Sequence, residues 1–182
     1  LNISLDKKIS FYVGRFVKHK GVQYSIAAYN KLKNQYDCDL YLIGGYKGDE
    51  LYEDCVNSGA IIMKRIPLDK LVDYYASADV FLLPLFHREA LDGCCFGISP
   101  IEALASGTPF VGTTLMHYPG NPDNLGKIPS SGEDMANSIE SVLQSPEKYT
   151  NVVEDAKKYY DWEKIANYNY QVYCKLFDKN YN

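Results

Sequence analysis

The stretch KISFYVGRFVKHKGVQYSIAAYNKL, residues 8–32, is predicted to form one complete strand, loop and helix. Residues 8–13 form an apolar, β-favouring run that ends at Gly14, and this pattern predicts a buried strand. Four apolar or aromatic residues then recur with the period of one helix face: Val22, Ile26, Tyr29 and Leu32. A strand that leads through a short loop into an amphipathic helix is typical of the first unit of an α/β fold.

The rest of the chain repeats this alternation. Further strands are predicted at residues 40–43, 60–63, 79–83 and 109–112. Helices are predicted at residues 49–57, 68–75, 99–105, 135–143 and 161–178. Because the strands are continuous apolar runs, we expect an α/β fold with a doubly wound, Rossmann-like parallel sheet and helices on both faces. Residues 1–182 are predicted to form a single domain, with the apolar side of helix 161–178 packing on it.

Composition narrows the class of protein. The chain has 182 residues, 46% of them hydrophobic, and a net charge of −4 with a pI of about 5.4. These values suit one globular domain and argue against a broad surface for nucleic acid or anionic membranes. No apolar run approaches the ~20 residues of a membrane helix, and no signal peptide is visible. The first residue is not Met, so we expect a processed chain or a piece of a longer one.

The five cysteines show no CxxC spacing, and the three histidines share no ligand spacing with them. Neither a metal site nor a disulfide scaffold is therefore predicted, and reduced thiols in the cytoplasm are expected. If the protein attaches to the cytoplasmic face of a membrane, we expect a segment outside this sequence to make the contact.

Ligands of open α/β sheets bind beyond the carboxyl ends of the strands. That rule selects residues 14–21, 64–67 and 85–98 as the functional edge. In the first segment, Gly14 allows a sharp turn, and Arg15 and Lys20 flank the start of a helix, where phosphate is favoured. The alternative interpretation is that these are two ordinary solvated cations around a βα turn.

A second motif begins the helix at residues 99–105. Ser99 suits the N-cap, Glu102 completes an S-x-x-E capping box, and Gly107 suits the left-handed position after the helix. A structural role in capping the helix is enough to explain these residues without any ligand. The functional interpretation uses the same geometry: the Glu102 carboxylate accepts the hydroxyls of a ribose, and the amides of Gly97 and Ile98 face a phosphate or sugar. Neither interpretation excludes the other.

These motifs together resemble one family. GRFVKHKG at residues 14–21 is similar to the G-R-x4-K-G motif in the donor domain of GT-B glycosyltransferases, in the large retaining group called glycosyltransferase family 4. DVFLLP at residues 79–84 and FGISPIEALASGTPFVG at residues 96–112 resemble a second stretch of the same family. The resemblance spans nearly the whole chain in order, and the combination is much more specific than either motif alone.

The resemblance implies a role for individual residues. Arg15 and Lys20 would grip the diphosphate of the donor, and Glu102 would bind its ribose. The donor site would also include the turn at Gly14, Lys64 beside the base, and the amides around three residues near the sugar and distal phosphate: Phe96, Gly97 and Ile98. No cofactor or metal is implied, because the nucleoside diphosphate sugar is itself the substrate.

One departure concerns the donor sugar. The first Glu of the family's E-x7-E pair contacts the donor sugar and would fall at position 94, so the resemblance places Cys94 in the donor site without that carboxylate. Either Glu89 or Asp92 in the same loop is a candidate substitute.

The resulting hypothesis is transfer of a sugar from a nucleoside diphosphate sugar to an acceptor hydroxyl, with retention at the anomeric carbon. The N-terminal acceptor-binding domain of the family is absent from this sequence, so we expect this chain to bind the donor without turning it over alone. Two alternatives stay open: a non-catalytic nucleotide-sugar-binding module, and a nucleotide-sugar epimerase of GT-B architecture. The base, the sugar and the acceptor do not follow from the sequence.

Overall fold

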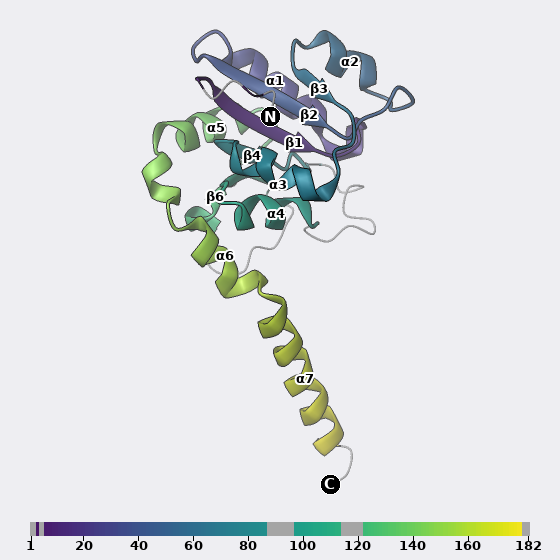
Figure 1. Ribbon diagram of the computed structural model, residues 1–182, viewed down its shortest axis with the longest axis vertical. Coiled ribbons are helices and arrows are strands. Elements are labelled where there is room, and N and C mark those ends of the chain that lie inside the picture. The colour runs from purple at the N-terminus through teal and green to yellow at the C-terminus, as the bar shows by residue number, and fades with distance from the viewer. Residues whose placement is uncertain (1–2, 4–5, 87–96, 114–121, 180–182) are drawn as a thin grey trace.

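The computed structural model describes residue 3 and residues 6–86, 97–113 and 122–179. The described strands form one parallel sheet in the order β3-β2-β1-β4-β5-β6 (Figure 1). Their bounds are β1 Lys8–Val13, β2 Cys38–Ile43, β3 Ile61–Met63, β4 Val80–Leu82, β5 Phe110–Val111 and β6 Gly126–Lys127. The chain winds outward in one direction from β1 to β3 and in the other from β4 to β6. The predicted doubly wound, Rossmann-like α/β fold is confirmed.

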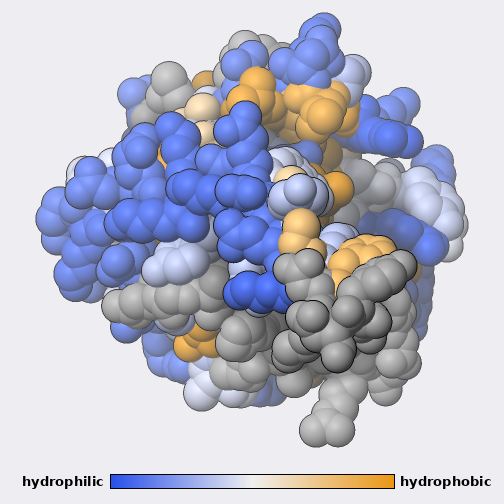
Figure 2. Space-filling view, turned by 90° about the horizontal axis from the view of Figure 1, so that it is seen from below, coloured by the Kyte–Doolittle hydropathy of each residue, from blue (hydrophilic) through white to orange (hydrophobic). Residues whose placement is uncertain are grey.

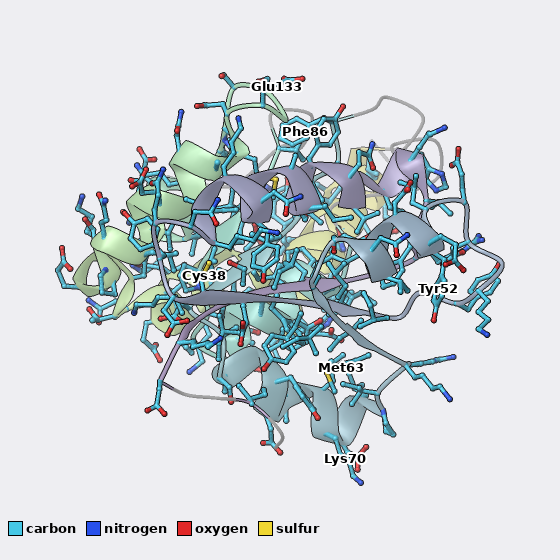
Figure 3. The ribbon with its side chains drawn as sticks, turned by 90° about the horizontal axis from the view of Figure 1, so that it is seen from above. Cys38, Tyr52, Met63, Lys70, Phe86 and Glu133 are labelled. Atoms are coloured by element: carbon cyan, nitrogen blue, oxygen red, sulfur yellow. The ribbon has the colours of Figure 1, made fainter. Side chains whose placement is uncertain are left out.

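Helices cover both faces of this sheet. The α-helices are α1 Val22–Leu32, α2 Tyr52–Asn57, α3 Leu68–Ala76, α4 Ser99–Ala105, α5 Met135–Gln144, α6 Val152–Tyr160 and α7 Trp162–Lys179. Short 3-10 helices are η1 Lys18–Lys20, η3 Pro122–Asn124 and η4 Pro146–Tyr149. Figure 3 shows the layers, with Phe86 on the side of α1 and both Met63 and Lys70 on the opposite side of the sheet. The sequence did not predict β6 or α6.

The strands β1, β2, β4 and β5 are buried on both faces, which explains why they are continuous apolar runs, whereas the edge strand β3 is partly exposed. In β2, Leu40 and Leu42 join a core cluster with α1 and α5, whereas Tyr41 and Ile43 join a second cluster with α3, α4 and α6. Successive side chains of a strand point to opposite faces, so one apolar run serves both clusters.

An acidic side chain fixes β1 beside β4. Asp79, directly before β4, accepts a hydrogen bond from the backbone N–H of Ile9 at 2.7 Å and from Lys8 Nζ at 2.9 Å. Because Asp79 precedes β4 and Lys8 and Ile9 begin β1, this contact joins the two strands at the amino edge of the sheet, opposite the carboxyl edge at which such sheets bind ligands.

Helix α7 differs from the expectation that it packs on the domain. It projects away from the sheet and contacts chiefly α6 (Figure 1). Its large apolar and aromatic side chains are exposed: Trp162, Tyr168, Tyr170, Tyr173, Leu176 and Phe177. In Figure 2, which looks from the end where α7 projects, hydrophobic residues lie at the surface among hydrophilic ones. A helical period shows that a helix is amphipathic, but it does not show which surface covers the apolar side.

Candidate functional site

The loops that follow β1, β4 and β5 meet at the carboxyl edge of the sheet. Gly21, at the end of the first loop, has a φ of 74° and lies directly against Pro84. A Cβ atom at Gly21 would stand 1.6 Å from the Pro84 carbonyl oxygen, so only glycine allows this approach. Thr113, after β5, donates its hydroxyl to the Leu85 carbonyl at 2.6 Å. The first predicted segment is thus in contact with Pro84, the residue directly before the segment 85–98, at the point where the winding reverses.

Arg15 is held in this loop by residues that follow β2. Its Nε and Nη2 atoms donate to Asp49 Oδ1 at 3.0 and 2.9 Å, and Nη2 also donates to the Tyr46 hydroxyl at 2.8 Å. The guanidinium carbon lies 5.3 Å from the centre of the Tyr46 ring, which adds a cation–π contact. The Arg15 side chain still has 54% of its surface exposed, so it is both anchored and accessible.

The Asp49 carboxylate is fully buried beneath Arg15. Its Oδ2 atom accepts the backbone N–H groups of Phe16 at 2.9 Å and of Tyr46 at 3.3 Å. Burial by itself raises the pKa of Asp49, but the hydrogen bonds from Phe16, Arg15 and Tyr46 outweigh it and hold that pKa below its usual value. The pKa of Arg15 is raised in turn, chiefly through its hydrogen bond to Asp49. Both groups are therefore charged at neutral pH.

Further contacts join the loops after β1 and β2 along their length. Lys18 Nζ lies 2.8 Å from Glu50 Oε1, and the backbone N–H of Leu51 donates to the Phe16 carbonyl at 2.8 Å. The Phe16 ring is completely buried and covers Gly45, where an added Cβ would stand 2.1 Å from it. The segment that carries the predicted phosphate-binding residues is consequently a packed structure rather than a loose turn.

Lys20 lies in the same loop as Arg15, as the sequence predicted. It ends η1, directly before Gly21, and its backbone N–H donates to the Val17 carbonyl at 3.0 Å. Its side chain is partly buried. Both cations therefore belong to the short segment between β1 and α1, where the sequence placed a phosphate.

The predicted capping box at the start of α4 is wrong. Ile98 occupies the cap position, and no side-chain cap hydrogen bond is made there among the described residues. Glu102 instead accepts a hydrogen bond on Oε2 from the Tyr75 hydroxyl of α3 at 3.0 Å. Burial, followed by the charge of Glu102, raises the pKa of Tyr75, so its hydroxyl stays a donor. Gly107, with a φ of 91°, takes the left-handed position expected after the helix.

Of the other residues predicted to bind the donor, some lie at or near the carboxyl edge of the sheet and others fall outside the described part of the chain. Gly14 donates its backbone N–H to the Ile43 carbonyl at 2.9 Å, which puts it at the same edge. Lys64 follows β3 and is exposed. Gly97 has a φ of 81° and, like Ile98, is exposed just before α4. Four predicted residues lie outside the described part of the chain: Glu89, Asp92, Cys94 and Phe96.

Three residues in contact with the predicted site were missed by the sequence reasoning. Tyr46 and Asp49 follow the carboxyl end of β2, and the rule that selected the other loops applies equally to this one. Tyr75 was assigned only to the apolar face of its helix, and it is 1% exposed. The signal for its polar role is that a buried tyrosine hydroxyl needs a hydrogen-bond partner.

The described residues contain neither a grouped set of metal ligands nor a membrane-spanning helix. No three His, Cys, Asp or Glu side chains are grouped there in a way that would hold a metal ion. No helix in residues 6–86, 97–113 and 122–179 is long and apolar enough to cross a membrane. The expectation of a donor site without a metal or cofactor stays a prediction.

Comparison with known proteins adds independent information. Residues 1–159 match the family model described as "Glycosyl transferases group 1". An uncharacterised glycosyltransferase, MJ1607, from Methanocaldococcus jannaschii is 27% identical over 186 residues, which cover 95% of this chain and 46% of that protein. The chain thus spans about half the length of this curated relative.

Solved structures share the fold. Sucrose-phosphate synthase from Thermosynechococcus elongatus superposes with a TM-score of 0.75 and 25% identity, covering 98% of this chain and 47% of that one. The pneumococcal O-GlcNAc transferase GtfA, solved in complex with UDP and GlcNAc, gives a TM-score of 0.66 at 17% identity, covering 92% and 36%. Both likenesses confirm the Rossmann-like architecture found in GT-B glycosyltransferases.

Proposed function

This chain belongs to the glycosyl transferases group 1 family, and from that premise we propose that it is the donor-binding half of a glycosyltransferase. Its ligand is a nucleoside diphosphate sugar, and the sugar passes to an acceptor hydroxyl with retention at the anomeric carbon. The acceptor is held by an N-terminal domain outside this sequence. The observation that carries the proposal is the meeting of the Arg15 and Lys20 loop with the β4 loop where the winding reverses.

The chemistry asks for stabilisation of a departing diphosphate while positive charge develops on the sugar. In the proposed site, Arg15 and Lys20 supply this stabilisation as fixed cations, which lower the barrier without covalent chemistry. Glu102 accepts the ribose hydroxyls with Oε1, while Tyr75 occupies Oε2. The backbone at Gly97 and Ile98 lies directly before the N-terminus of α4 and faces the sugar or distal phosphate. Lys64, after β3, lies beside the base.

Binding is tested by titration calorimetry with UDP, GDP and ADP and their common sugar conjugates. We expect saturable binding of one nucleotide series by the wild type and its loss in the Arg15→Ala, Glu102→Ala double variant. Lys148→Ala is a matched control, because it removes an exposed cation from η4. The neighbouring Tyr149 lines a cavity with Asp79, at the opposite, amino edge of the sheet. A folded wild type that binds none of the series refutes the proposal.

Turnover is tested separately with radiolabelled donor. We expect the isolated chain to bind the donor but to transfer no sugar, and activity to return when the acceptor domain is supplied. Appreciable transfer by this chain alone contradicts the two-domain interpretation. Failure with every acceptor supports a non-catalytic binding module, and release of an altered free product without any acceptor supports an epimerase.

A further inference from the structure

The buried carboxylate of Asp49 joins the backbone of two loops to the guanidinium of Arg15. A fully buried charge is costly unless it is paired and hydrogen-bonded, and here four N–H groups satisfy it. Two of those groups are backbone amides of Phe16 and Tyr46, which tie the loops after β1 and β2 to one point. The other two belong to the guanidinium of Arg15, whose side chain is about half exposed.

The contacts of Arg15 use one edge of its guanidinium. Nε and Nη2 face Asp49 and the Tyr46 hydroxyl, whereas the hydrogen bonds of the described structure leave Nη1 for other partners. A planar guanidinium that is fixed along one edge presents its remaining N–H groups in a set direction. The fixing groups are rigid, because Asp49 is buried and is itself bonded to two backbone amides.

We propose that Asp49, assisted by the Tyr46 hydroxyl, is a positioning residue that holds Arg15 by one edge and directs the other edge to the donor diphosphate. This inference rests on the proposed function and deepens it. The advantage is preorganisation: an arginine already confined to its bound rotamer loses less conformational entropy when the anion binds. Tyr46 contributes both a hydroxyl acceptor and a ring beneath the cation.

The competing effect is electrostatic. Asp49 neutralises part of the charge of Arg15 and repels an anionic ligand, so removing its charge would tighten diphosphate binding if positioning were unimportant. The two effects have opposite signs, which makes the proposal testable. Glu50 provides a matched control, because it carries the same charge in the adjacent position but is paired with Lys18.

The experiment measures affinity for the nucleoside diphosphate that wild type binds, by calorimetry, in Asp49→Asn, Glu50→Gln and Tyr46→Phe. We expect about three- to tenfold weaker binding by Asp49→Asn, from the ordering cost of one long side chain, and a smaller loss in Tyr46→Phe. Glu50→Gln is expected to bind as the wild type or slightly more tightly. In an Arg15→Ala background, Asp49→Asn should no longer weaken binding, because its positioning action passes through Arg15 and only the loss of its repulsion remains.

A spectroscopic measurement separates positioning from general damage to the fold. The Arg15 Nε–H group should give a slowly exchanging 15N resonance in the wild type that is lost in Asp49→Asn, while thermal unfolding confirms that the variant is folded. If Asp49→Asn does not fold, a double-mutant cycle of Tyr46→Phe and Arg15→Ala replaces it. If the effects of these two substitutions on nucleotide affinity are simply additive, the proposal is overturned.

Equal or tighter binding by folded Asp49→Asn overturns this inference and leaves the proposed function standing. Absence of nucleotide binding by the wild type overturns both.

Discussion

Replacing Gly21 with alanine tests whether contact between the β1 and β4 loops organises the site. Gly21 has a φ of 74°, and an added Cβ would lie 1.6 Å from the Pro84 carbonyl oxygen, where real Cβ contacts begin near 3.0 Å. Gly59 provides a matched control, since its φ is 83° and an added Cβ meets nothing within 4 Å. Both substitutions place alanine in a left-handed backbone conformation, but only Gly21→Ala also brings a Cβ atom into contact with Pro84.

The expected magnitudes follow from these two costs. Left-handed backbone costs an L residue about 1–2 kcal/mol, part of which is offset because alanine restricts the unfolded chain. Gly59→Ala should therefore lose about 1 kcal/mol of unfolding free energy. The forced separation from Pro84 adds roughly 1–3 kcal/mol of overpacking, so Gly21→Ala should lose about 2–4 kcal/mol. For a chain of this size each kcal/mol lowers Tm by about 2–4 °C.

The assay is thermal and urea unfolding followed by far-UV circular dichroism, with nucleotide affinity measured well below both midpoints. Gly21→Ala should unfold at a clearly lower temperature than Gly59→Ala and should also bind nucleotide more weakly, because the β1 loop has moved. Equal loss of stability in the two variants would show that the loops are not in the close contact described. If Gly21→Ala is destabilised but binds nucleotide with normal affinity, the contact between Gly21 and Pro84 is not needed for binding.

Two further predictions concern side chains beside the site and in the core. Tyr75→Phe removes the hydrogen bond to Glu102 at 3.0 Å, and it should lower stability by about 0.5–1.5 kcal/mol and weaken nucleotide binding. Unchanged affinity by calorimetry would show that this hydrogen bond does not orient the carboxylate. Cys55 is fully buried, and burial raises its pKa to about 12. At pH 8 iodoacetamide should label it at least about tenfold more slowly than exposed Cys174, as located by peptide mass spectrometry. Comparable rates would contradict the packing around α2.

The sequence by itself determined the order of the elements apart from β6 and α6, and it indicated the edge on which the site is expected. Apolar runs and helical periods predicted β1 and α1 with the bounds that the structure has, because strand and helix periods are local properties of the chain. The glycines and cations after β1 were placed at the functional edge by the rule that ligands bind beyond the carboxyl ends of parallel strands. The predicted roles of Arg15, Lys20 and Glu102 in binding remain predictions.

Only the tertiary structure decided which side chains meet. Glu102 pairs with Tyr75, 27 positions away, rather than capping its own helix, because the packing of α3 against α4 offers a buried hydroxyl as a partner. Arg15 pairs with Asp49 across 34 positions, and α7 turns its aromatic residues outward although its period resembles that of a packed helix. Local pattern fixes the face on which a residue lies, whereas its partner depends on distant chain segments that no local period encodes.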